Sequence, residues 1–242
     1  MTNRNFRVRL SRQHTLALIF LPASWASLIG LSTLGSLIGY APWERGLLYT
    51  GVSAFYLIAA YSILKLAGPS PATTTRDVQR GCAIVVLALV ILASLFLIAR
   101  GLKGGESTPW NLPSGELGMM VQLARNVGVD SNGWIDFVIC VGPYFFMSAI
   151  AVPIIEEVLF ARLLLTKGGP LSKSAVTANL LCGGLFVITH LIGRGTASVE
   201  LCLIWFSLRY LYNFAYQWTG LLWVSVAIHG YWNLAVVLPP FF

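Results

Sequence analysis

The residues of this sequence that are best suited to chemistry lie inside its apolar stretches. They are the adjacent acids Glu156 and Glu157, the histidine His190, and His229 with Asn233 four positions later. A carboxylate and an imidazole in a low-dielectric pocket can share a water molecule and take its proton. A second imidazole and an amide can donate hydrogen bonds to a developing oxyanion. These groups suffice for peptide hydrolysis, but two histidines and a carboxylate are also a common catalytic zinc set, so both mechanisms stay open.

The composition indicates that these groups lie in a membrane. Of the 242 residues, 57% are hydrophobic and only 10% are charged, whereas soluble domains carry about 25% charged residues. A water-soluble globule could not bury so much apolar surface, and a disordered chain needs the opposite composition. The net charge of +7 does not indicate a nucleic-acid partner. Basic residues gather before the first apolar run, which is a membrane-orientation signal: Arg4, Arg7, Arg9 and Arg12.

The sequence predicts an all-α, polytopic transmembrane helix bundle with about seven spans. A span needs about 20 apolar residues, and backbone groups in lipid must bond within their own segment, so each span is expected to be a helix. Placing the N-terminus on the inner side puts most of the basic residues there, which predicts an N-in orientation. If the sixth stretch is re-entrant, the C-terminus changes side. The stretches are roughly 15–40, 46–66, 81–99, 138–165, 175–192, 199–216 and 220–238.

These spans are expected to form a single membrane domain over residues 1–242. Residues 1–133 supply N-terminal helices and a long loop at about 100–134, which we interpret as a solvated connector with a short surface helix at 116–127. The last four helices, 138–238, form the core that carries the polar groups. The four cysteines lie in apolar stretches without CxxC spacing, so neither a disulfide framework nor a sulfur-ligated zinc site is expected: Cys82, Cys140, Cys182 and Cys202.

Helix geometry brings the polar groups to a comparable depth. Counted from the inner ends of their helices at 1.5 Å per residue, Glu156, His190 and His229 lie about 16, 25 and 16 Å deep. In a hydrocarbon core about 30 Å thick, all three fall in the middle band. If these helices also face one another, they form one polar site within the lipid.

Local spacing agrees with such a site. His229 and Asn233 share a helix face as an i, i+4 pair, and so do Phe186 and His190, which lets an aromatic ring wall the site. Pro153 removes a donor to the carbonyl of Ala149 and can bend its helix, which would open space beside the carboxylates.

Three motifs resemble those of the CPBP family of intramembrane proteases, which includes the CAAX prenyl endopeptidases of the Rce1 type and bacterial Abi proteins. They are Glu156-Glu157-Val-Leu-Phe, Phe186-x-x-x-His190 and His229-x-x-x-Asn233, beside the family pattern EExxxR, FxxxH and HxxxN/D. The resemblance covers about residues 140–238. It implies an endopeptidase in which Glu156 activates water with help from His190, while His229 and Asn233 hold the oxyanion.

The resemblance also implies the surroundings of the site. No cofactor is expected, with zinc held by Glu156, His190 and His229 as the alternative. The expected partners are membrane lipid and a peptide or protein substrate near the bilayer, such as a prenylated C-terminus, a bacteriocin or peptide precursor, or a C-terminal membrane-sorting tail. The resemblance also implies an integral, multi-pass membrane protein, located in a bacterial inner membrane or an ER-type membrane.

One position departs from the family pattern. The family's arginine follows the phenylalanine directly, but that position is Ala161 here, and the arginine comes one later as Arg162. In an α-helix, an i+5 pair is turned apart by about 140°. We therefore do not expect Glu157 to pair with Arg162, which should extend toward the inner interface. Glu157 would instead be protonated or meet a polar group on a neighbouring helix.

Two other functions fit the same residues. One is a non-catalytic immunity or scaffold protein of the same fold, and the other is a small proton-coupled transporter that uses Glu156 and the histidines as a relay. Several further polar residues of the last helices are expected to make helix–helix hydrogen bonds rather than line a substrate path: Asn179, Arg209, Asn213 and Gln217.

Overall fold

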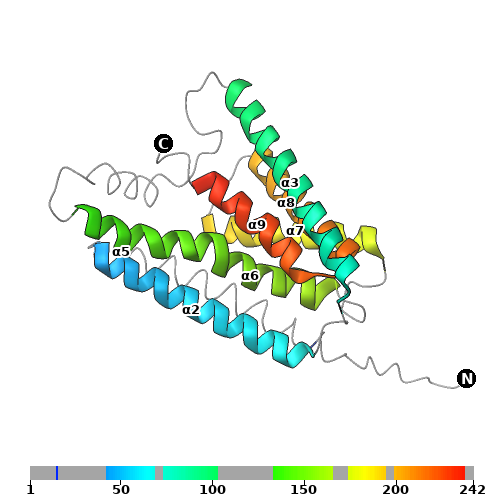
Figure 1. The fold of residues 1–242 in the computed structure, drawn as a ribbon, viewed down its shortest axis with the longest axis horizontal. Helices are drawn as coiled ribbons and strands as arrows, with labels where there is room; N and C mark the ends of the chain where they lie inside the picture. Colours follow the sequence, from blue (N-terminus) through cyan, green and yellow to red (C-terminus); the bar gives the residue numbers. More distant parts are fainter. Residues whose placement is uncertain are drawn as a thin grey trace, which may run out of the picture.

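The computed structural model describes residue 15 and residues 42–68, 73–102, 133–165, 174–194 and 199–237. Throughout these ranges the regular structure is helical (Figure 1), which confirms the predicted all-α class. The helices are α2 (Pro42–Ala67), α3 (Thr75–Leu102), α5 (Gly133–Phe146), α6 (Val152–Glu157), α7 (Ala175–Arg194), α8 (Val199–Thr219) and α9 (Leu222–Val237), together with the π-helical segments η1 (Met147–Ala151) and η2 (Val158–Leu165).

Four stretches in the described ranges are long and apolar enough to cross a membrane: Glu44–Ala67, Thr75–Ser94, Val138–Leu165 and Ala175–Ile192. They correspond to the second to fifth predicted spans. The predicted first span and most of the long loop, including its helix at 116–127, lie outside the described residues. Helix α8 is interrupted by polar residues, and α9 has only 16 residues, so neither reaches this standard. Seven spans and the N-in orientation therefore stay predictions.

The segments α5, η1, α6 and η2 form one continuous helix, Gly133–Leu165, at the centre of the arrangement. Helix α2 runs along one side of it, and α9 packs against η1 and α6 on another side (Figure 1). Helices α7 and α8 pair with each other and contact η2, while α3 packs on α9. The central helix, which carries both glutamates, is thus in contact with α2, α7, α8 and α9.

Two wide π-helical turns flank the short α-helical segment with the glutamates. At the end of η1, the N–H of Val152 donates to the carbonyl of Met147, five residues back. Pro153 follows at once, at the start of α6, and is buried. Since proline has no N–H to give the carbonyl four residues back, a change in helical type beside it has a clear cause. Such π-helical turns are frequently found at functional sites.

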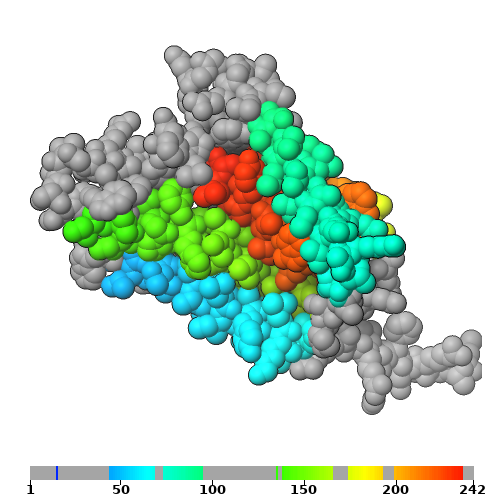
Figure 2. All heavy atoms as spheres, in the orientation of Figure 1, coloured from blue at the N-terminus to red at the C-terminus, as the bar shows by residue number. Residues whose placement is uncertain are grey.

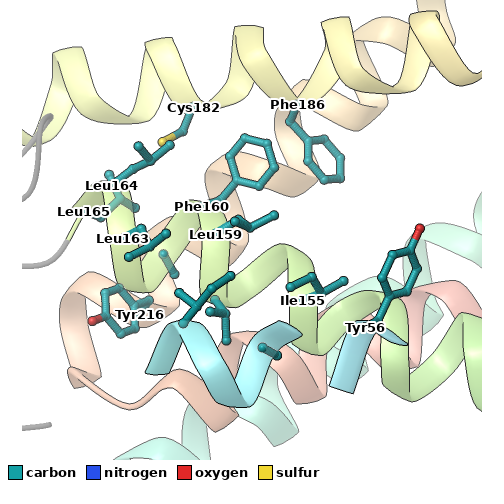
Figure 3. Packing of buried hydrophobic residues seen from close by; sticks show 14 of the residues in the cluster. Tyr56, Ile155, Leu159, Phe160, Leu163, Leu164, Leu165, Cys182, Phe186 and Tyr216 are labelled. Atoms are coloured by element: carbon teal, nitrogen blue, oxygen red, sulfur yellow. The ribbon is translucent and has the colours of Figure 1, made fainter. Parts of the chain in front are cut away.

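Most of the interior is apolar, and large apolar side chains also cover the outer faces. One buried cluster joins η2 to α2, α7 and α8, with Phe160, Cys182 and Phe186 side by side between η2 and α7 (Figure 3). Helix α2 forms the blue and cyan flank of the molecule in Figure 2. Its side chains Leu47 and Ile58 are 64% and 66% exposed. Large exposed apolar side chains are costly in water but suit contact with lipid.

Candidate active site

Glu157 is held by a guanidinium from another helix. Arg209 on α8 donates from Nη1 to Oε1 at 2.7 Å and from Nη2 to Oε2 at 2.8 Å. Both side chains have 0% exposure. The Nε of Arg209 donates in turn to Oδ1 of Asn213, 2.7 Å away on the same helix. A paired fork of this kind fixes the plane of the carboxylate as well as its charge.

His229 on α9 lies between the two glutamates. Its Nδ1 is 2.9 Å from Oε1 of Glu157, and its Nε2 is 3.5 Å from Oε2 of Glu156. An ionised carboxylate can only accept, so Glu157 selects the tautomer with hydrogen on Nδ1. The ring of Tyr212 stacks on the imidazole at 4.5 Å between centroids and 14° between planes. The imidazole therefore has a fixed orientation, with Nε2 directed to Glu156.

The neighbouring acid Glu156 is in a different situation. Its side chain is 16% exposed, whereas that of Glu157 is fully buried. Among the residues that the structure describes, the buried Oε2 of Glu156 has no hydrogen-bond partner. Buried polar atoms are nearly always satisfied, and an exception calls for an explanation such as a water or a ligand. The two adjacent acids thus differ. Both oxygens of Glu157 accept hydrogen bonds from protein side chains, whereas Oε2 of Glu156 accepts none from the described residues.

His190 on α7 is oriented by its own helix. Its Nδ1 is 2.9 Å from the carbonyl oxygen of Phe186. A carbonyl can only accept, so this hydrogen bond places the proton on Nδ1 and leaves the lone pair of a neutral ring on Nε2. The ring of Phe186 lies 4.2 Å from His190 and 6.1 Å from His229, between centroids. The aromatic residue that the sequence predicted beside His190 therefore contacts both imidazoles.

Asn233 connects α9 to the central helix. Its Nδ2 donates to the carbonyl oxygen of Ser148, in η1, at 2.9 Å. This contact uses one of the two hydrogens of the amide and leaves the second for another acceptor. It also anchors the turn of α9 that follows His229.

Arg162 is directed to the end of α2 rather than to Glu157. Its side chain is 4% exposed, and Nη2 donates to the carbonyl of Gly68 at 3.0 Å. Gly68 has φ +85, in the left-handed region where glycine is favoured, and follows the end of α2. The segment after Glu157 is π-helical, so the α-helical angle assumed for the i+5 pair does not apply. The separation of Glu157 from Arg162 was expected, but that reason for it was wrong.

Arg209 is the site residue that the sequence interpretation missed. It was expected to make helix–helix hydrogen bonds, as Asn179 does with Gln217 at 3.2 Å, but it was not connected with Glu157. A usable signal existed. A glutamate and an arginine in separate apolar helices are each expensive in lipid, and pairing them lowers the cost of both. Treating the two as one ion pair would have placed α8 beside α6.

The described residues do not fit a metal ion as they stand. Within the described ranges, no three His, Cys, Asp or Glu side chains are arranged to hold one. Both oxygens of Glu157 accept from Arg209, and Nδ1 of His229 faces the same carboxylate. A buried guanidinium beside the acids also opposes a second positive charge.

Residues 140–235 match the family model described as Rce1-like, type II CAAX prenyl endopeptidase. The match begins in α5, ends in α9 and includes all three motifs, so it confirms the resemblance seen in the sequence. At the level of the family, it supports a CAAX-type intramembrane protease, and with the four apolar helices it supports an integral membrane protein. No curated protein and no solved structure matches the chain.

Proposed function

We propose that this protein is an intramembrane endopeptidase in which Glu156 activates the attacking water. The observation that carries the proposal is the difference between the adjacent acids. Glu157 is bound by Arg209 and His229, whereas Oε2 of Glu156 is buried without a hydrogen-bond partner among the described residues. The family match supports peptidase activity in general, and the oxygen without a hydrogen-bond partner supports Glu156 as the base.

The first chemical step is proton transfer from water. The Glu156 carboxylate accepts the proton while the water oxygen forms a bond to the carbonyl carbon of the substrate. The lone pair on Nε2 of His190 accepts a hydrogen bond from the same water and orients it. Glu156 then returns the proton to the leaving nitrogen as the carbon–nitrogen bond breaks, which yields a carboxyl group and an amine.

The oxyanion is stabilised from α9. Asn233 donates its second amide hydrogen to the oxyanion. Nε2 of His229, which carries a lone pair in the resting enzyme, takes the water's proton from Glu156 and donates it in a hydrogen bond to the oxyanion, then gives it back to Glu156. The negative Glu157, 2.9 Å from Nδ1, stabilises the imidazolium in the way a buried acid does behind a catalytic histidine. Within this scheme no cofactor is required.

The proposed substrates are peptides or proteins whose cleavage site lies in or near the bilayer, such as a C-terminal processing signal or a lipidated tail. The exposed apolar faces of the helices favour a substrate that arrives through the lipid rather than from water. The aromatic ring of Phe186 beside His190 and His229 makes the surroundings of the site apolar, which favours an apolar side chain or lipid group in the substrate.

The test uses purified protein in lipid nanodiscs with a prenylated CAAX peptide and an apolar C-terminal tail peptide, and reads products by mass spectrometry. Glu156→Gln should lower kcat by about 10²–10⁴-fold, the range of general base catalysis. His190→Ala should also reduce it. The matched control is Gln217→Leu, a polar residue of α8 bonded to Asn179 rather than to the acids. Cleavage by Glu156→Gln at the wild-type rate would contradict the proposal.

A further inference from the structure

We infer that Arg209, from a helix other than that of the acidic pair, is the positioning residue that sets which nitrogen of His229 carries the proton. The inference rests on the proposed function and names a residue outside the three motifs. The chain of contacts is continuous: Arg209 holds both oxygens of Glu157, and Oε1 of Glu157 accepts from Nδ1 of His229. The other nitrogen, Nε2, faces Glu156 at 3.5 Å.

The charge of Arg209 determines what Glu157 can do. Next to a buried guanidinium the carboxylate stays ionised, and an ionised carboxylate only accepts hydrogen bonds. His229 must then present Nδ1–H to it. Without the guanidinium, a fully buried glutamate takes up a proton rather than remain charged and unpaired. Its O–H then donates to Nδ1, and a neutral His229 carries its hydrogen on Nε2, toward Glu156.

Arg209 is itself held rigidly. Its Nε donates to Asn213, and its guanidinium carbon lies 5.0 Å from the ring centroid of Phe160 and 5.7 Å from those of Phe186 and Tyr212. Guanidinium groups are weakly hydrated and stack favourably on aromatic faces, so this enclosure suits an arginine better than a lysine. Tyr212 also stacks on His229, so the same ring contacts both the guanidinium of Arg209 and the imidazole of His229.

The two arginines near the acids have separate tasks. Arg162 follows Glu157 by five positions but donates to the end of α2 at Gly68. Arg209 is 52 positions from Glu157 in the sequence and makes both of its charge-assisted contacts. Glu157 is thus paired with an arginine of another helix, α8, and not with the arginine that follows it on the central helix.

The tautomer can be read directly, because the chain has three histidines, His14, His190 and His229. The protein is labelled with ¹⁵N-histidine, placed in nanodiscs and measured by long-range ¹H–¹⁵N spectra. The spectra compare wild type with Arg209→Gln and Arg209→Lys, and Arg162→Gln is the control. His229→Gln identifies the signals of His229. We expect His229 to be protonated at Nδ1 in wild type and in Arg162→Gln, and to shift to the Nε2–H form in Arg209→Gln. On the proposed reaction, kcat/KM of Arg209→Gln should fall about 10–100-fold, as for other groups that orient an active imidazole.

The outcomes are separable. A folded Arg209→Gln protein whose His229 keeps the Nδ1–H form would overturn the inference. If Arg209→Gln does not fold, Arg209→Lys decides: it keeps the charge but loses the fork, so the Nδ1–H form should persist while kcat falls about tenfold at unchanged KM. Unchanged kcat in Arg209→Lys would overturn the positioning role. A tautomer shift in a protein that cleaves neither peptide would refute the proposed function and leave the inference standing.

Discussion

Gly230 of α9 lies directly against the carbonyl oxygen of Ala149 on the central helix. A Cβ at position 230 would overlap that oxygen and would lie 3.9 Å from the ring of Pro153. Pro153 is the residue that cannot donate to the same carbonyl. The close approach therefore occurs where α9 packs beside the change from π-helix to α-helix, and it sets how near His229 comes to the glutamates.

Gly230→Ala should separate α9 from the central helix, because the carbonyl is part of the backbone and cannot rotate away. We expect a loss of about 1–3 kcal/mol in stability, typical of overpacking, and a fall in peptidase activity. Thermal unfolding in detergent measures the first effect. Gly51→Ala on α2 is the control, since nothing lies within 4 Å of its added Cβ. Equal melting temperatures for both variants would contradict the close approach.

The ion pair between Glu157 and Arg209 should show strong coupling. Arg209→Met removes the partner of the buried Glu157, which must then take up a proton to stay in the apolar interior, and should cost about 3–5 kcal/mol, while replacing both residues with apolar ones should cost much less than the two single changes together. The measurement is a double-mutant cycle of Glu157→Leu and Arg209→Met by unfolding in mixed micelles. Additive single effects would refute the buried pair.

Phe186 is expected to affect activity more than stability. Phe186→Leu conserves most of the volume, so it should cost less than about 1.5 kcal/mol. The ring nevertheless contacts both imidazoles, and its loss frees them to rotate, so we expect kcat/KM to fall about tenfold, equivalent to 1.4 kcal/mol. The control is Phe214→Leu on α8, which is 46% exposed. A comparable loss of activity in both variants would argue against a specific role for the Phe186 ring beside the imidazoles.

Chelators should not inhibit the enzyme. The oxygens of Glu157 and Nδ1 of His229 are engaged with other protein groups, so the described residues do not offer three ligands without rearrangement. Activity is assayed with 1,10-phenanthroline and EDTA, followed by added Zn²⁺. Loss of activity with a chelator and its return with zinc would show that Glu156, His190 and His229 rearrange around a metal.

Sequence alone was sufficient for the helices of the described ranges and for the prediction that Glu156 and His229 lie at a comparable depth. The helices follow from apolar length, and matched depth predicts that polar groups on different spans lie at one level. The structure places Oε2 of Glu156 3.5 Å from Nε2 of His229. The estimate depended on depth along each helix, which hydropathy gives well, because a helix rises a fixed distance per residue.

Rotation about each helix axis was what the sequence could not supply. Whether Arg209 faces Glu157 depends on how α8 turns on its axis. Arg209, Asn213 and Gln217 are spaced by four and share one face of α8, but this spacing does not say which neighbouring helix that face meets. The direction of Arg162 was equally hidden, because the π-helical turns from Val158 to Leu165 change the angular step per residue. Hydrophobic periodicity assumes α-helical geometry and gives no warning of such a change.

The pairing of Glu157 with Arg209 also constrains how the chain enters its membrane. An isolated charge near the bilayer centre costs about 2.5–3.5 kcal/mol during insertion, and α8 is not among the helices apolar enough to cross alone. Each of the two helices brings the counterion that the other lacks. We therefore expect the central helix and α8 to leave the insertion machinery together. In a ribosome-bound chain truncated before residue 199, the central helix should stay at the translocon, where crosslinking detects it. In a longer chain that includes α8, the crosslink should disappear.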